Sequence, residues 1–132
     1  MPDIALPITS LTAVVLATVL LLLTCKVITL RRRDGVVLGD NDDRVLTKAI
    51  RGQGNASEQV PLGLVMLGLC ELQGASFGLL AMLATIFVVG RVMHAVYFAV
   101  HGTPWPLRLY GMLLTLVAQT GLIIMLLMTV VI

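Results

Sequence analysis

The sequence predicts an all-α integral membrane protein, a four-helix bundle that forms a single domain over residues 1–132. Of the 132 residues, 58% are hydrophobic and 12% are charged, and the mean hydropathy is +1.02. This is too apolar for a soluble domain with one core. Four apolar segments are long enough to cross a bilayer, which takes about 20 residues of helix. We expect these spans at 4–30, 44–72, 77–100 and 106–132.

The connections between the segments predict how the chain crosses the membrane. The first, the loop 31–43, starts with three arginines and continues with a Gly-, Asn- and Asp-rich run typical of a loop. Asp42 or Asp43 is expected to cap the second helix. Lys and Arg are concentrated in the first and third connections. Because such residues favour the cytoplasmic side, we expect both connections there and both termini on the non-cytoplasmic side.

Composition also limits the classes of partner. The first apolar segment is longer than the core of a signal peptide and has no positively charged region before it, so we expect a retained span. A net charge of +2 gives no reason to expect nucleic acid. No Cys/His spacing of a metal site occurs in the sequence. The expected surroundings are therefore the lipid bilayer, with neither a nucleic-acid partner nor a metal.

Polar residues recur within the second predicted helix. Arg51, Asn55 and Glu58 follow one another at steps of four and three, which places them on one side of a helix, and Lys48 extends this stripe. A charged side chain near the centre of a membrane helix costs about 2.5–3.5 kcal/mol, so those that persist usually face the protein interior. We expect a buried polar site, the alternative being a stripe solvated at the headgroup level.

The short connection near Gly74 predicts which residues of the second and third helices lie at the same depth. Residues equally distant from such a turn share a level, because both helices rise by the same amount per residue. This places Glu58 level with Arg91, and Asn55 level with His94. A carboxylate and a guanidinium at one depth in a membrane are expected to pair.

Two further residues allow alternatives. His94 is interpreted as a hydrogen-bonded packing histidine in preference to an acid–base group. Arg108 follows Pro106 at the start of the fourth helix and has no carboxylate partner in its own connection. It is expected either to bind lipid headgroups or to stabilise an anion in the polar site.

The pattern in the second helix resembles the signature of the MAPEG family, the membrane-associated proteins in eicosanoid and glutathione metabolism, in its short bacterial branch. The resemblance covers nearly the whole chain. The residues that carry it are Arg51-x-Gln53-x-Asn55-x-x-Glu58-x-x-Pro61, then Arg91 and His94, and then Arg108-x-x-Gly111. Gly52 and Gly54 stand where the family often has alanine or bulkier residues, and each loosens a helix by about 1 kcal/mol relative to alanine.

The resemblance implies a homotrimer that binds glutathione, as co-substrate, between subunits near the cytoplasmic side. The small lipophilic substrates would be electrophiles or lipid hydroperoxides that react with the glutathione thiolate. Carried over by position, Arg108 would be the catalytic residue that stabilises the thiolate. The residues that would bind glutathione are Arg51, Gln53, Asn55, Glu58, Arg91, His94 and Tyr97.

The predicted function is therefore a glutathione-dependent membrane transferase or peroxidase, located in a bacterial inner membrane. The alternative is a non-catalytic lipid-binding or scaffold protein that keeps the fold, with a Glu58–Arg91 pair retained for stability. A small transporter subunit fits less well, because one polar seam open to a single side does not suggest alternating access.

Overall fold

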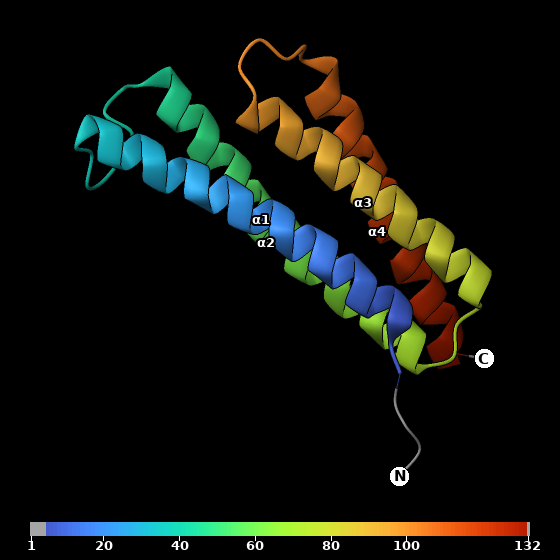
Figure 1. Ribbon diagram of the computed structural model, residues 1–132. Coiled ribbons are helices and arrows are strands. Elements are labelled where there is room, and N and C mark those ends of the chain that lie inside the picture. Colours follow the sequence, from blue (N-terminus) through green and yellow to red (C-terminus); the bar gives the residue numbers. More distant parts are fainter. Residues whose placement is uncertain (1–4, 132) are drawn as a thin grey trace.

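Four antiparallel helices make up the computed structural model, which describes residues 5–131 (Figure 1). They are α1 (Pro7–Asp34), α2 (Arg44–Leu72), α3 (Phe77–Ala99) and α4 (Pro106–Val131), and no strand occurs within the described residues. The all-α fold of four helices is thus confirmed. The expected first residue of the first span, at 4, and the last of the fourth, at 132, lie outside the described residues.

Three of the helices, α1, α3 and α4, are long and apolar enough to cross a membrane. The fourth, α2, has 29 residues but carries the polar stripe. Its crossing of the bilayer, and the side on which the termini lie, stay predictions. The start of α1 and the end of α4 both lie close to the turn between α2 and α3, so these three features share one end of the bundle (Figure 1).

The connection between α1 and α2 is shorter than expected, because α1 continues beyond Leu30 to Asp34. The three arginines at 31–33 occupy its last turn, where positive charge is favourable at the negative end of the helix dipole. Gly35 ends the helix in the left-handed conformation, with φ of 66°. At the other end of the loop the predicted cap of α2 is confirmed, since Asp43 Oδ1 accepts the Val45 N–H at 2.9 Å.

Glu71 ties the end of α2 to the start of α1. Leu6 precedes α1 and has no side chain that can cap it. The Glu71 carboxylate acts in its place, accepting the backbone N–H groups of Ile8 at 2.9 Å and Thr9 at 2.8 Å. A negative charge at this helix end also opposes the positive end of the dipole.

Glycines set how closely α2 approaches α3. A methyl group added at Gly52 would overlap Phe98, and one added at Gly63 would overlap the ring of Phe87. Both contacts lie at the depth that a symmetrical turn near Gly74 predicts. In a membrane, small residues at helix contacts are a main source of helix association.

The contact between α3 and α4 is closer still, backbone against backbone. A Cβ at Gly90 would lie 2.8 Å from the Gly111 carbonyl oxygen, and one at Gly111 would lie 2.7 Å from the His94 nitrogen. In Figure 1 the α1/α2 pair and the α3/α4 pair come together at the 73–76 turn and diverge toward the loops at 35–43 and 100–105. Arg51 and Asn55 of α2, His94 of α3 and Arg108 of α4 belong to the parts of their helices nearer those two loops.

Candidate functional site

A polar hollow of about 320 Å³ lies between α2, α3 and α4 in the diverging half of the bundle. Three helices supply its walls, so no single helix could form it. Its lining residues are Arg51, Gly54, Asn55 and Glu58 of α2, His94 and Phe98 of α3, and Arg108 of α4. Most of the residues that the sequence singled out are therefore brought together.

The charged groups of this hollow have no partners within the described chain. In residues 5–131 the ion pairs join Arg33 to Asp34 and to Asp43, and neither Arg51, Glu58 nor Arg108 takes part in one. Two guanidinium groups and a carboxylate thus face one space without neutralising each other. Such a wall is complementary to a small molecule that carries both negative and positive charge.

Buried polar atoms point to the same place. Asn55 Oδ1 and His94 Nδ1 are buried and have no hydrogen-bond partner among the described residues. A buried polar group left without a partner costs about 1–3 kcal/mol. Both residues line the hollow. Two unsatisfied polar residues thus form part of the wall of the hollow, and the interpretation of His94 as a hydrogen-bonded packing histidine is wrong for its Nδ1.

The expected ion pair between Glu58 and Arg91 is not formed. Arg91 is 1% exposed, its guanidinium nitrogens are without hydrogen-bond partners in the described chain, and no carboxylate there lies within 4.0 Å of it. The predicted depth of the two residues agrees with the contacts between α2 and α3, but the prediction that Glu58 faces Arg91 is wrong. The buried side of α2 carries Gly52, Ala56 and Val60 at four-residue steps. Glu58 comes two residues after Ala56, hence about 200° around the helix, and is exposed.

A second hollow, of about 450 Å³, adjoins the first, since Asn55, His94 and Arg108 line both. Its other lining residues are Tyr97, Trp105, Leu109 and Met112. The two hollows form one site with a charged part and a more apolar part. The sequence reasoning missed Leu109 and Met112 as site residues. Their signal was spacing, since Met112 follows Arg108 by four residues and Leu109 by three, and such steps bring side chains to neighbouring positions on a helix.

The remaining predicted residues lie at different distances from the charged part. Tyr97 lines the second hollow and packs edge-on against Phe98, with the ring centroids 5.1 Å apart. Gln53 lines neither hollow. Gln53 and Arg51 flank Gly52, so they point about 200° apart around α2. The guanidinium carbon of Arg108 lies 5.6 Å from the centroid of the Phe98 ring.

Lys48 does not join the polar hollow, although it extends the stripe in sequence. Its ammonium lies 4.1 Å from the centroid of the Tyr97 ring and 3.4 Å from the Val100 carbonyl oxygen. It lines a separate hollow, which Phe98 also lines. The stripe is therefore divided between two spaces.

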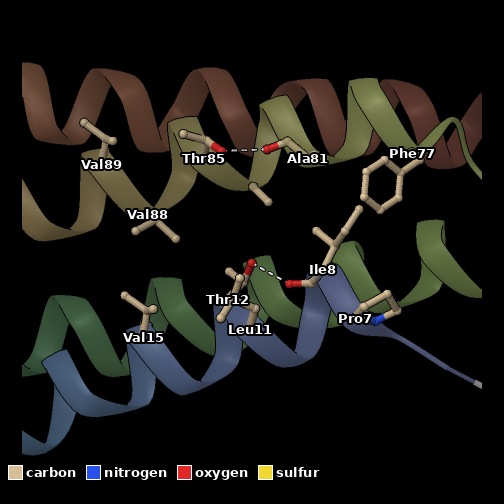
Figure 2. A pocket seen from close by; sticks show the side chains of 11 residues that line it. Pro7, Ile8, Leu11, Thr12, Val15, Phe77, Ala81, Thr85, Val88 and Val89 are labelled. Atoms are coloured by element: carbon tan, nitrogen blue, oxygen red, sulfur yellow. Dashed lines mark hydrogen bonds between the residues drawn. The ribbon is translucent and has the colours of Figure 1, made fainter.

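An apolar hollow of about 400 Å³ lies toward the opposite end of the bundle, between α1 and α3 (Figure 2). No charged residue lines it. The hydroxyl groups of Thr12 and Thr85 donate to the carbonyls of Ile8 and Ala81 in their own helices, at 2.7 and 2.8 Å. This hollow therefore lacks the charged side chains that line the charged site.

Comparison with known proteins identifies the family. The family model described as the MAPEG family matches residues 9–128. The chain belongs to the MAPEG family. It is 32% identical over 105 residues to the inner membrane protein YecN of Escherichia coli strain K12, covering 80% of this chain and 79% of that protein. The YecN protein of E. coli O6:H1 matches equally well.

Family membership agrees with the apolar helices, and this MAPEG protein is an integral membrane protein. The name of the relative gives its location, the inner membrane, and states no activity.

Proposed function

We propose that this MAPEG protein is a glutathione-dependent membrane transferase that also reduces lipid hydroperoxides, acting at the site between α2, α3 and α4. One observation carries the proposal. Arg51, Glu58 and Arg108 share a hollow in which none has an ion-pair partner within residues 5–131, beside the unsatisfied Asn55 Oδ1 and His94 Nδ1.

The charges of the hollow match those of glutathione. This tripeptide carries two carboxylates, one ammonium group, two amides and a thiol. Arg51 would bind a carboxylate and Glu58 the ammonium group, and Asn55 lines the same hollow. Hydrogen bonds between charged partners are roughly twice as strong as neutral ones. Glutathione is therefore a better occupant than a neutral peptide.

Arg108 is the residue that we assign to the thiol. A free thiol has a pKa near 8.5, and a neighbouring cation lowers it, which raises the thiolate fraction at neutral pH. Arg108 lines both hollows, so it lies between the charged part and the apolar part. A thiolate held there faces the space in which an apolar substrate would bind.

The reaction is nucleophilic substitution at the electrophile. With an aryl halide, the thiolate sulfur forms a C–S bond, the carbon–halogen bond breaks, and the halide leaves with the electron pair. The thiol proton has already passed to water. With a lipid hydroperoxide, two glutathione molecules are oxidised to the disulfide while the hydroperoxide is reduced to an alcohol and water. Trp105, Leu109 and Met112 provide apolar contacts for either substrate.

We further propose that the protein assembles as a homotrimer, and that neighbouring copies cover the polar side of α2. Arg51 and Glu58 are exposed on the single chain. Leaving charges in contact with lipid costs about 2.5–3.5 kcal/mol each. A neighbouring copy packed along this side removes that cost. Gln53 points the other way around α2, so in a trimer it would contact glutathione held on a different copy.

The proposal is tested by separating turnover from binding. Purified protein is assayed for conjugation of glutathione to 1-chloro-2,4-dinitrobenzene, and glutathione affinity is measured by calorimetry. We expect Arg108→Gln to lower kcat about 100-fold or more, the range typical of removing one preorganised charge-stabilising group, with affinity nearly unchanged. The matched control is Arg32→Gln, an exposed arginine outside the site.

A parallel loss of kcat and affinity would make Arg108 a binding residue. The absence of any thiol-dependent conjugation, or of hydroperoxide reduction, in the unaltered protein would favour the non-catalytic alternative. That alternative relied on a stabilising Glu58–Arg91 pair, and the two residues do not pair in this chain.

A further inference from the structure

A basic hollow of about 320 Å³ lies where α1, the start of α2 and the end of α3 meet. Four basic side chains line it, Lys26 from α1, Arg44 and Lys48 from α2, and His101 from the loop after α3. No Asp or Glu lines it. Its volume is at the lower end of the range for small-ligand pockets.

The two lysines are held in place by carbonyl groups of the last residue of α3 and of the residue that follows it. The Lys26 ammonium donates to the Ala99 carbonyl, reaching it from within the apolar part of α1. The Lys48 ammonium donates to the Val100 carbonyl at 3.4 Å. An ammonium group has three donors, so each lysine keeps donors that these bonds do not use. Both ammonium groups are therefore held in position and can still donate hydrogen bonds to a ligand.

Arg44 adds a cation with no competing contact, since it forms no side-chain hydrogen bond or ion pair within residues 5–131. Of the three carboxylates nearest in sequence, Asp42 is exposed and does not line the hollow, and the other two are engaged elsewhere. Asp43 accepts the Val45 N–H and lies 3.7 Å from Arg33. Asp40 accepts the Thr47 hydroxyl at 2.7 Å. Like charges gathered without a counter-charge raise the energy of the site until an anion binds.

We propose that this basic hollow binds a phosphate group, supplied by the headgroup of an anionic phospholipid. Phosphate presents several acceptor oxygens in a compact group, so donors arriving from different helices can bind it together. The hollow lies at the end of the bundle that carries Trp105 and the arginines 31–33, features of the membrane–water interface. Basic pockets between transmembrane helices at such a level bind anionic headgroups.

This site is distinct from the proposed glutathione site. Among the described residues Phe98 lines both the basic hollow and the polar one, whereas Lys26, Arg44 and Lys48 line the basic hollow and not the polar one. A lipid bound here would join α1 and α2 to the end of α3. It would therefore stabilise the diverging half of the bundle, in which the glutathione site lies.

The test measures thermal unfolding of the full chain in a neutral detergent without glutathione. Three additives are titrated separately: a short-chain phosphatidylglycerol, the matching phosphatidylcholine, and inorganic phosphate. We expect phosphatidylglycerol to raise Tm at concentrations where phosphatidylcholine has no effect. Arg44→Gln removes a charge without losing an intrachain contact, and it should raise the concentration for half the effect about tenfold.

The double variant Arg44→Gln/Lys48→Gln should weaken the response further, and Arg32→Gln, an exposed arginine outside the hollow, should leave it unchanged. A variant-sensitive response to inorganic phosphate as well would identify the phosphate group itself as the ligand, from either source. If Arg44→Gln and the double variant respond as Arg32→Gln does, the proposal is wrong. Glutathione affinity measured in Arg44→Gln should be unchanged. Failure of the lipid proposal can therefore be distinguished from failure of the proposed glutathione function.

Discussion

The pair of variants Gly52→Ala and Gly54→Ala tests how α2 is held against α3 beside the site. The substitution is the same at both positions, and both lie on one helix two residues apart. A methyl group at Gly52 would overlap Phe98 Cβ and lie 2.8 Å from its Cγ, whereas one at Gly54 would meet nothing within 4 Å. The Phe98 Cβ is fixed by the backbone of α3, so a rotamer change cannot relieve the overlap.

The expected magnitudes follow from two opposed effects. Replacing glycine by alanine in a helix stabilises it by about 1 kcal/mol. Overpacking a filled contact costs about 1–3 kcal/mol. Gly54→Ala should therefore gain up to about 1 kcal/mol, and Gly52→Ala should show a net loss of up to about 2 kcal/mol. The gain in helix propensity is the same in both variants. The difference between their free energies of unfolding therefore gives the cost of overpacking at Phe98.

The assay is unfolding in mixed micelles, followed by far-UV circular dichroism during titration with a denaturing detergent. Equal free energies of unfolding for the two variants would refute the close approach of α2 and α3 at Gly52. A stabilised Gly52→Ala would refute it more strongly. Because Gly54 lines the polar hollow and Gly52 does not, these variants are compared for stability and not for glutathione affinity.

Two further outcomes follow from the polar contacts at the ends of α1 and α2. Glu71→Gln should destabilise the fold by about 1 kcal/mol, because it removes the charge that caps the start of α1; an unchanged Tm would contradict this. The pKa of Asp40 lies below its ordinary value of 3.8, chiefly because the Thr47 hydroxyl donates to its carboxylate. The loop is therefore stabilised above that value and loses the contribution as the pH falls through the lower pKa. NMR titration should give a lower midpoint for Asp40 in the parent than in Thr47→Val, and equal midpoints would contradict the contact.

Depth in the bundle was predictable from the sequence, and direction around the helix was not. The tight turn near Gly74 set the levels, and the contacts of Gly52 with Phe98 and of Gly63 with Phe87 confirm them. The side of α2 that faces α3 is decided by packing between two surfaces. Spacing within α2 shows that polar residues share a side, but it does not say which neighbour that side meets.

A second signal was present in the sequence and carried more information than the charges. Small residues recur on α2 at 52, 56 and 63, and these positions pack against α3. Arg51 of the polar stripe precedes Gly52 by one residue, so the stripe lies beside that surface. Lys26 was a signal of another kind, a single charge in an otherwise apolar span. Lys26 donates to the Ala99 carbonyl at the end of α3. The sequence could not predict this contact, because the two residues lie far apart in the chain.

The central claim is that the hollow lined by Arg51 and Glu58 binds glutathione, and calorimetric titration of glutathione into the purified protein tests it most directly. We predict saturable binding to the unaltered protein, weakened about tenfold or more in Arg51→Ala and in Glu58→Ala. Arg32→Ala should bind as the unaltered protein does. Equal affinity in all four proteins, or no binding to the unaltered protein, would contradict the account.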